Sequence, residues 1–353
     1  DPTSSSAQTD ITDCQAVVTQ TRRRNDIRRG APQMNDINIA FTVDSNNLDQ
    51  VAIVIASILS TSADPTRLRF FIVVDGRQDA AENKINGWAS RPPRLTVVPY
   101  RNAFSSRTTL GHISTAALLR TQLPDSLPDL DRVLYLDADI VVRRDIAGLY
   151  QSDLGGKPVG GILDIGMYLR LRRDRIRHDA TLADYFLKLG LDPHQSQYIN
   201  SGVLLMDLEA LRELGFSARA LRFSNEHGAS LITMDQCLIN TILLGRIALL
   251  DPRWNVGGYL MGLPRHHHYV PRRLQRDLRL QKADPWLVHY TGKSKPWNAA
   301  SVWHGEDWWA YAGRSGIAWP AVPAVGKRPS RLKAAWRSVT WGFSYALSRV
   351  HPD

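Results

Sequence analysis

Two aspartates, Asp137 and Asp139, lie one residue apart in the stretch VLYLDADIVV, residues 133–142, which is otherwise apolar and typical of a buried β-strand. If the strand continues through them, the two carboxylates share one face, because side chains alternate along a strand. Carboxylates this close repel each other unless a cation or hydrogen-bond donors compensate their charge. The spacing therefore suggests a site for Mg²⁺ or Mn²⁺, which prefer oxygen ligands. The alternative is a solvated strand end without a metal.

The elements that would position these carboxylates alternate between short apolar runs and amphipathic stretches from Ile37 onward. The expected strands cover residues 37–43, 69–75, 95–100, 132–142, 158–165 and 198–208, and the expected helices 48–59, 80–88, 114–123, 209–223 and 234–245. Apolar runs separated by helices predict an α/β fold with a mostly parallel, Rossmann-like sheet covered by helices on both faces. In such sheets ligands bind beyond the carboxyl ends of the strands, where Asp44, Asp75 and Asp137 fall.

The ends of the chain differ from this pattern. Residues 1–36 are polar, with a TRRRNDIRR charge run, and predict a poorly ordered leader or an accessory helix. Residues 37–318 form the predicted main domain, and residues 319–353 a linker and a basic amphipathic helix. With aromatic and basic side chains at helical spacing, residues 327–350 favour peripheral contact with an anionic membrane; the alternative is a helix docked on the main domain.

The basic segment 167–179, MYLRLRRDRIRHD, is too charged for a core element. We expect either a lid that binds an anionic acceptor or a solvated loop. The whole chain of 353 residues has a formal charge of +10, which also favours an anionic partner. Its two cysteines are too few for a disulfide framework, and no apolar run reaches the roughly 20 residues of a membrane span. These features predict a cytoplasmic protein, free or peripheral on the inner face of the membrane.

Four motifs occur in order along the chain: YLDADIVV, YINSGVLLMDL, TMDQCLIN and VHYTGKSKPW. Together they resemble the signatures of glycosyltransferase family 8. This family comprises retaining enzymes of the GT-A type, including bacterial lipooligosaccharide and lipopolysaccharide galactosyl- and glucosyltransferases and, more distantly, glycogenin. The resemblance covers roughly residues 37–312.

The resemblance implies a UDP-sugar donor and a divalent ion held by Asp137, Asp139 and His289. This mixed carboxylate and imidazole set suits Mn²⁺ better than Mg²⁺. The remaining donor contacts implied for the nucleotide and its diphosphate are Asp44, Asn46, Arg120, Ala138, Gly292 and Lys295. Asn47 stands where related sequences often carry an aromatic residue that stacks on the base.

Five polar residues are implied around the donor sugar: Arg120, Asp164, Asn200, Asp235 and Gln236. Retention by double displacement needs a carboxylate nucleophile, as in retaining glycosidases. The matching residue is Gln236, which is uncharged, so a front-face route with internal return is favoured. The neighbouring residue Asp235 does carry a carboxylate, so a nucleophile mechanism stays an alternative. The other interpretation of Asp235 is the N-cap of the helix that follows.

The sequence thus predicts a retaining, metal-dependent glycosyltransferase that moves galactose or glucose from UDP to a hydroxyl of a cell-envelope glycan or glycolipid. One alternative is a nucleotidyltransferase that makes NDP-sugars, although VDSNNLDQVA after the first strand lacks the Gly-rich basic loop of that class. The other is a basic, non-catalytic nucleic-acid-binding protein, for which affinity would depend strongly on salt. We expect no nucleic acid, because the basic residues cluster in one segment and the tail.

Overall fold

The computed structural model describes residues 36–44, 47–75, 78–88, 92–100, 115–176, 181–192, 197–227, 231–257, 272–299 and 302–320. The elements from β1 to α12 belong to one compact unit within Ile37–Asp353. Three predictions fall outside the described residues: the leader up to residue 35, the donor contact Asn46, and the amphipathic helix at 327–350.

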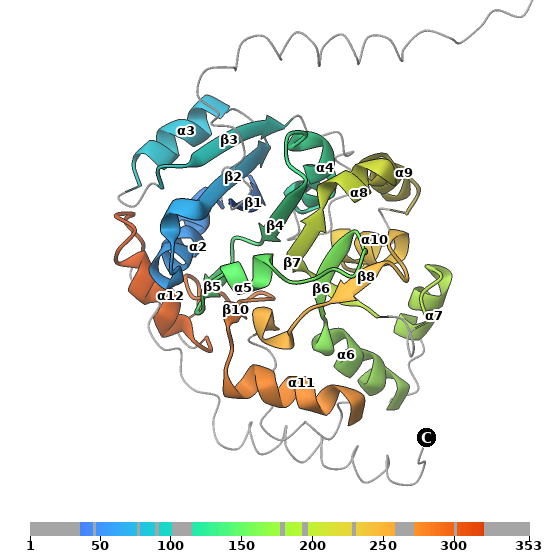
Figure 1. Ribbon diagram of the computed structural model, residues 1–353. Coiled ribbons are helices and arrows are strands. Elements are labelled where there is room, and N and C mark those ends of the chain that lie inside the picture. Colours follow the sequence, from blue (N-terminus) through green and yellow to red (C-terminus); the bar gives the residue numbers. More distant parts are fainter. Residues whose placement is uncertain are drawn as a thin grey trace, which may run out of the picture. The chain divides into compact units, whose positions relative to one another are not determined.

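The main sheet has seven strands within the described residues, in the order β3-β2-β1-β4-β7-β6-β8 (Figure 1). These are β1 (Ile37–Val43), β2 (Leu68–Asp75), β3 (Leu95–Tyr100), β4 (Arg132–Leu136), β6 (Val159–Leu163), β7 (Ile199–Asp207) and β8 (Ile247–Leu249). Strands β3, β2, β1 and β4 are parallel, as are β6 and β8, whereas β7 is antiparallel to both of its neighbours. The predicted mostly parallel α/β sheet is confirmed.

The reversed strand β7 brings its first residues to the edge where β1, β4 and β6 end, which we call the carboxyl edge. Leu136 at the end of β4 pairs with Val203, and Leu163 at the end of β6 pairs with Ile199. Asn200 and Ser201 therefore lie between the ends of two neighbouring strands. Ligand-binding residues of this fold class gather at that edge.

A second, smaller sheet has the order β5-β10-β9, with β5 (Ile140–Val142), β9 (Val256–Gly257) and β10 (Leu287–His289). The stretch 132–142 is therefore two strands: β4 ends at Leu136, so Asp137 lies at its carboxyl end and Asp139 just past it, as expected, and a separate strand, β5, follows from Ile140. The chain leaves the main sheet after Leu136 and enters the small sheet at Ile140. The two aspartates occupy the crossing, where their carboxylates avoid burial inside either sheet.

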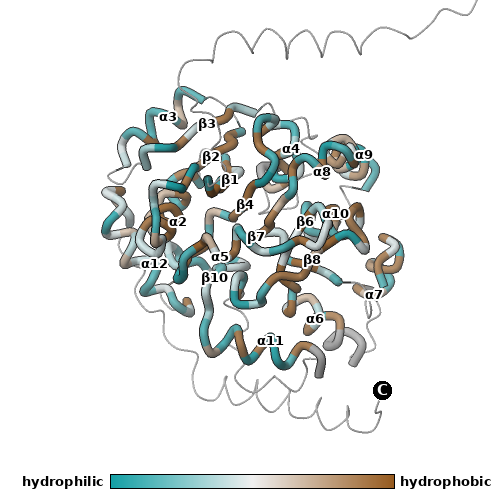
Figure 2. The backbone as a smooth tube through the Cα atoms, in the orientation of Figure 1, coloured by the Kyte–Doolittle hydropathy of each residue, from teal (hydrophilic) through white to brown (hydrophobic). Residues whose placement is uncertain are grey.

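Helices cover both faces of the main sheet (Figure 1). On one face β1 directs Ile39, Phe41 and Val43 against α2 (Leu48–Thr61), with α3 (Gln78–Asn86) and α5 (Ala147–Tyr150) beside it. On the other face Val133 and Tyr135 of β4 pack with the second group of helices. This group comprises a 3-10 helix (Thr115–Gln122), α4 (Leu123–Ser126), α8 (Leu208–Glu213), α9 (Phe216–His227) and α10 (Asp235–Ile242). Figure 2 shows the hydrophobic strands between these layers.

The remaining elements are two short 3-10 helices (Pro65–Arg67 and Pro252–Trp254), α6 (Ile165–Ile176), α7 (Thr181–Lys188), α11 (Arg272–Ala283) and α12 (Gly305–Ala312). Helix α6 corrects the expectation for the basic segment 167–179 over residues 167–176, which form a helix and contribute to the core; residues 177–179 lie outside the described residues. Met167, Tyr168 and Leu171 of α6 are buried. Their helical spacing provides an apolar stripe that the run of arginines obscured.

Two other predicted helices differ from the structure. The segment 114–123 is mainly a 3-10 helix, Thr115–Gln122, and the short helix α4 follows it from Leu123, with Pro124 in its first turn. The predicted helix 209–223 is broken at Gly215, which has a φ of 59° and so ends α8 in the left-handed region that favours glycine. Among the described residues, no helix is both long and apolar enough to cross a membrane.

Candidate functional site

A cavity of about 400 Å³ opens at the carboxyl edge of the main sheet. Most of the predicted site residues line it: Asp44, Arg120, Asp137, Ala138, Asp139, Asn200, Asp235, Gln236, His289, Gly292 and Lys295. Asp164 does not line the cavity, but it accepts a hydrogen bond from Gln236, and Gln236 does line it. The fold thus gathers side chains from β1, β4, β7, α10 and β10 at one place.

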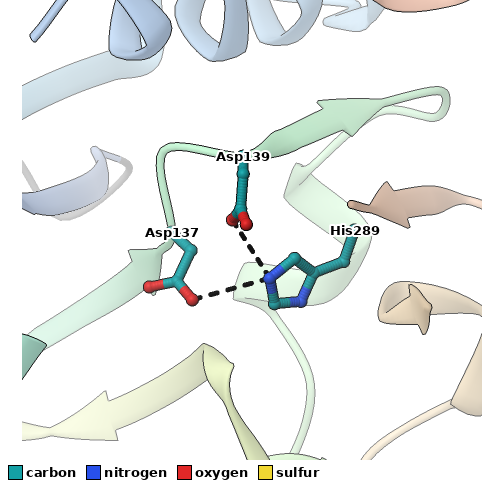
Figure 3. Close-up of side chains that lie close together, drawn as sticks. All are labelled: Asp137, Asp139 and His289. Atoms are coloured by element: carbon teal, nitrogen blue, oxygen red, sulfur yellow. Dashed lines mark ion pairs between the residues drawn. The ribbon is translucent and has the colours of Figure 1, made fainter. Parts of the chain in front are cut away.

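Asp137, Asp139 and His289 form a compact group, with one ligand atom of each within 4.8 Å of the others. His289 Nε2 lies 3.1 Å from Asp139 Oδ1 and 3.6 Å from Asp137 Oδ2 (Figure 3). Asp137 follows β4, Asp139 precedes β5, and His289 ends β10. Because Ile140 pairs with His289 across β5 and β10, the small sheet fixes the imidazole beside the two carboxylates.

Because Gly202 has no side chain, His289 and Asp137 can pack directly against its backbone. A Cβ atom at Gly202 would overlap the His289 ring and lie 2.6 Å from Asp137 Oδ2. His289 and Asp137 thus occupy the space that a side chain at position 202 would need. The backbone also holds Asp137 directly, since its N–H donates to the Gly202 carbonyl over 2.9 Å.

The donor set fits a divalent ion. Two carboxylate oxygens and one imidazole nitrogen converge, and this combination suits Mn²⁺ among the ions that accept oxygen ligands. His289 Nδ1 lies 2.9 Å from Asn255 Oδ1, so the other ring nitrogen faces the carboxylates. A metal-binding imidazole commonly donates its second ring N–H in this way.

Two cationic side chains flank the carboxylates. The Lys295 ammonium contacts Asp139 Oδ2 and donates to the Tyr290 carbonyl over 2.6 Å. Burial acts to raise the pKa of Asp139, but the charges of His289 and Lys295 outweigh it and hold that pKa well below its usual range. Asp139 is therefore ionised at neutral pH.

Arg120 joins two acids. Its guanidinium NH2 lies 2.9 Å from Asp137 Oδ1, and NH1 lies 3.1 Å from Asp235 Oδ2. NH1 also donates to the Ser201 carbonyl over 2.9 Å, and the guanidinium lies over the Tyr135 ring, 4.6 Å from its centroid. Tyr135 in turn donates to Asp137 Oδ1 over 2.6 Å.

Asp235 is buried, with 5% of its surface exposed. Burial raises its pKa, while the charge of Arg120 opposes that rise. Asp235 is the first residue of α10 and not its N-cap, which corrects the N-cap alternative. The residue before it, Met234, has φ 42° and ψ −112°, a backbone conformation that costs about 1–3 kcal/mol for a residue with a side chain. The strained turn presents Asp235 and Gln236 to the cavity.

The Gln236 carboxamide is held on both sides. Its Nε2 donates to Asp164 Oδ2 over 2.9 Å. Its Oε1 accepts from Asn200 Nδ2 over 3.0 Å and from the Ser201 N–H over 3.3 Å. Asp164, directly after β6, thus helps to fix the orientation of the Gln236 side chain.

On the side of the cavity formed by β1 and α2, Asp44 Oδ1 accepts from the N–H and Nδ2 of Asn47 over 3.2 and 3.1 Å. Asn47 lines the cavity. Gly292 has a φ of 85°, which favours glycine, and a Cβ there would meet no atom within 4 Å.

Trp297 and Asn255 were missed by the sequence analysis. Trp297 packs against Trp308, with ring centroids 5.2 Å apart, and also lines the cavity. Asn255 contacts His289 and Asn200. Its surroundings, PRWNVGG, read as an ordinary turn, and no sequence signal marked it.

A second group of potential metal ligands comprises His304, Glu306 and Asp307. One ligand atom of each lies within 4.8 Å of the others. Arg143 already supplies its positive charge, since the guanidinium NH1 lies 3.1 Å from Asp307 Oδ2 and 2.8 Å from His304 Nδ1. We therefore place the candidate metal site at Asp137, Asp139 and His289.

Comparisons with known proteins point to one family. The model of "Glycosyl transferase family 8" matches residues 38–301, more than half of the chain. The chain is 29% identical over 203 residues to general stress protein A of Bacillus subtilis, covering 56% of this chain and 64% of that protein. The chain therefore spans less than two thirds of the length of this relative.

The chain is also 27% identical over 272 residues to the lipopolysaccharide 1,2-glucosyltransferase of Escherichia coli, covering 76% of this chain and 74% of that protein. Among solved structures, the galactosyltransferase LgtC in complex with donor and acceptor sugar analogues superposes with a TM-score of 0.67 at 22% identity. That superposition covers 86% of this chain and 99% of LgtC, and it establishes similarity of fold.

Proposed function

The chain belongs to glycosyltransferase family 8, and on this premise we propose that it is a retaining, metal-dependent enzyme that transfers a hexose from a UDP-sugar. Its fold is of the GT-A type. The observation that carries the proposal is the convergence of Asp137, Asp139 and His289 on one wall of a cavity that Arg120 and Lys295 also line.

In this proposal Asp137, Asp139 and His289 hold a divalent ion, with Mn²⁺ favoured over Mg²⁺. A bound ion neutralises charge that develops on the diphosphate when it leaves the sugar. Lys295 adds a point charge at the same wall, and the glycine at position 292 allows the backbone to approach an oxygen closely. Asp44 accepts hydrogen bonds from the base or ribose on the β1 side.

Retention is proposed to follow the front-face route. The bond between the anomeric carbon and the leaving phosphate oxygen breaks, a bond to the acceptor oxygen forms on the same face, and the acceptor proton passes to the leaving diphosphate. Two contacts favour this route. Gln236 has no charge and is fixed by Asp164 and Asn200, so its dipole is oriented to stabilise oxocarbenium character. Asp235 is engaged by Arg120, which disfavours it as a nucleophile.

For the transferred group and its acceptor, we propose galactose or glucose and a hydroxyl of a cell-envelope glycan or glycolipid. The relative that acts on lipopolysaccharide as a 1,2-glucosyltransferase supports this substrate class. The nucleotidyltransferase alternative is not retained, because the matching family model is that of a glycosyltransferase.

Peripheral membrane contact through residues 327–350, on the cytoplasmic face, remains part of the proposal on the strength of charge and helical spacing alone. Co-sedimentation with vesicles that contain anionic lipid tests it against neutral vesicles. If the protein sediments with neither type of vesicle, the membrane contact is wrong, and the enzymatic proposal is unaffected.

The deciding experiment incubates the protein with UDP-galactose and UDP-glucose, with Mn²⁺ and with EDTA. We expect one UDP-sugar to be hydrolysed or transferred only with the metal, and to raise the melting temperature in Mn²⁺. If neither sugar nucleotide is consumed and neither stabilises the fold, the donor assignment is wrong. A Mn²⁺-dependent response to another nucleotide sugar would keep the metal site and replace the donor.

A further inference from the structure

A continuous series of side-chain hydrogen bonds leads from Asp164 to His289. Gln236 Nε2 donates to Asp164 Oδ2 over 2.9 Å, and Asn200 Nδ2 donates to Gln236 Oε1 over 3.0 Å. Asn255 Nδ2 donates to Asn200 Oδ1 over 2.9 Å, and Asn255 Oδ1 lies 2.9 Å from His289 Nδ1. We call these three carboxamides the amide relay. It joins the ends of β6 and β10 through β7 and α10.

The direction of every bond in the amide relay is fixed by groups that have a single role. A carboxylate oxygen accepts, and Gln236 turns its Nε2 toward Asp164 Oδ2. A backbone N–H only donates, and the N–H groups of Ser201 and Gly202 point at Gln236 Oε1 and Asn200 Oδ1, over 3.3 and 3.0 Å. Both carboxamides therefore turn an oxygen toward the next donor. It follows that Asn255 donates with Nδ2 and turns Oδ1 to His289.

His289 must consequently carry a proton on Nδ1, because Asn255 Oδ1 can only accept. Nε2 is then the ring nitrogen that faces Asp137 and Asp139, at 3.6 and 3.1 Å. When an ion is bound, an imidazole that carries its proton on Nδ1 alone offers the lone pair of Nε2, as a metal ligand requires. The opposite tautomer would leave a bare Nδ1 against a carbonyl oxygen and a proton in the place of the ion.

Asn255 is held rigidly enough for this role. Asp251 caps the short 3-10 helix before it by accepting from the Arg253 N–H over 3.0 Å, and Trp254 is buried. Directly after Asn255, strand β9 pairs with β10, placing Gly257 opposite His289. Asn255 itself is only 7% exposed. Both partners of the Nδ1 hydrogen bond are therefore fixed by the same small sheet.

We propose that Asn255 is a positioning residue that locks His289 with its proton on Nδ1 and Nε2 directed at the cation, and that the amide relay sets the orientation of Asn255. The proposal rests on the proposed function, because the cation is that of the glycosyl transfer. It adds a link that the family motifs did not mark: Gln236 and Asn200, implied at the donor sugar, and His289, implied at the metal, share one hydrogen-bonded series.

Two substitutions separate the roles of the Asn255 amide. Asn255→Leu keeps the approximate shape but neither accepts nor donates. Asn255→Asp still accepts from His289 Nδ1 but no longer donates to Asn200. As a matched control, Asn38→Leu removes a buried asparagine whose Nδ2 donates to the Arg132 carbonyl over 3.2 Å and which does not line the cavity.

Isothermal titration of the full chain with Mn²⁺ is the first measurement. We expect Asn255→Leu to raise the Mn²⁺ dissociation constant by about 10- to 100-fold, the usual effect of removing the partner of a ligating histidine. Asn255→Asp should bind Mn²⁺ nearly as the wild type does, and Asn38→Leu should bind it unchanged. Unaltered Mn²⁺ affinity in a folded Asn255→Leu protein would overturn the proposal, as would equal losses in the Leu and Asp variants.

The second measurement needs no bound metal. Nitrogen NMR of isotope-labelled histidine, with the His289 signals assigned by their absence in His289→Gln, reports which ring nitrogens carry protons. We expect the wild type to show a slowly exchanging proton on Nδ1 and Asn255→Leu to lose that slow exchange. A His289 without a proton on Nδ1 would overturn the proposal even in an active transferase. A protonated, protected Nδ1 in a protein that binds neither Mn²⁺ nor a UDP-sugar would overturn the proposed function instead.

Discussion

The Arg120 guanidinium lies 2.9 Å from Asp137 Oδ1, so the other oxygen of this carboxylate is left facing His289. The same guanidinium reaches buried Asp235 on its other side. One arginine therefore orients a proposed metal ligand and compensates a second acid. Arginine suits this double role because its planar fork presents several donors at fixed angles.

Replacing Arg120 tests both roles. Arg120→Met leaves two acids without their cation, and breaking a buried ion pair in this way typically costs about 3–5 kcal/mol of unfolding free energy. Urea denaturation measures the loss. Arg120→Lys keeps a charge but cannot reach both acids with a fork, so it should restore only part of the stability. Full restoration by lysine would show that the geometry of the guanidinium is unimportant.

The loss in Arg120→Met should depend on pH. Burial raises the pKa of Asp235 in the folded state, and Arg120 holds that rise back. An acid whose folded pKa is raised favours the fold while protonated, and this contribution disappears as the pH rises through the folded pKa. Without Arg120 the rise should grow. The difference in unfolding free energy between wild type and Arg120→Met should therefore be larger at pH 8 than at pH 4.

Metal binding should stabilise the fold through Asp139. A ligand at 100 times its dissociation constant adds about 2.7 kcal/mol to the unfolding free energy, so Mn²⁺ should raise the melting temperature of the wild type. Asp139→Asn should abolish that rise and the metal-dependent turnover while the protein remains folded. Asp131→Asn, at an exposed carboxylate, is the control and should respond as the wild type does. A Mn²⁺ response preserved in Asp139→Asn would remove Asp139 from the ligand set.

Gly202→Ala should displace the metal group. The new Cβ would lie 2.6 Å from Asp137 Oδ2 and overlap the His289 ring, so we expect a loss of Mn²⁺ affinity of at least about tenfold, comparable to the loss of an outer partner of a ligand. Gly160→Ala is the matched control on β6, since its Cβ would meet Leu154 Cδ2 at 2.6 Å. That control should lower the melting temperature and leave Mn²⁺ affinity unchanged. Equal Mn²⁺ affinity in both variants would contradict the role assigned to Gly202.

Gln236→Glu should make activity fall as the pH rises. It replaces the amide that donates to Asp164 Oδ2 with a second carboxylate, and of two adjacent carboxylates one has a raised pKa because their charges repel. Below that pKa a protonated carboxyl can donate as the amide did. We therefore expect kcat/KM of Gln236→Glu to fall as the pH rises, relative to wild type. A ratio that does not vary with pH would argue against the Asp164 contact in the active state.

The sheet could be predicted from sequence because long apolar runs separated by helices are compatible with few folds other than a mostly parallel sheet. The strands at 37–43 and 95–100 lie where expected. Helix α6 was missed because Arg170 lies between its buried residues and more arginines follow Leu171, so charge concealed the helical spacing of Met167, Tyr168 and Leu171. The domain limits at 36 and 318 stay predictions.

The candidate site was predictable to the extent that its residues carry charge or belong to a motif. Asp137 and Asp139 stand out locally, whereas His289 was found only through the family resemblance. Asn255 lies outside every motif. Its importance comes from the pairing of β9 with β10, and a contact between side chains 34 residues apart leaves no local pattern.

The crossing at residues 137–139 has a mechanical consequence. Asp137 directly follows a strand of the large sheet, whereas Asp139 directly precedes one strand of the small sheet and His289 ends another. An ion held by all three would therefore link the two sheets. The docking of the small sheet would then vary with metal occupancy. Amides of β5 and β10 would exchange their hydrogens more slowly in Mn²⁺ than in EDTA, and those of β2 equally in both.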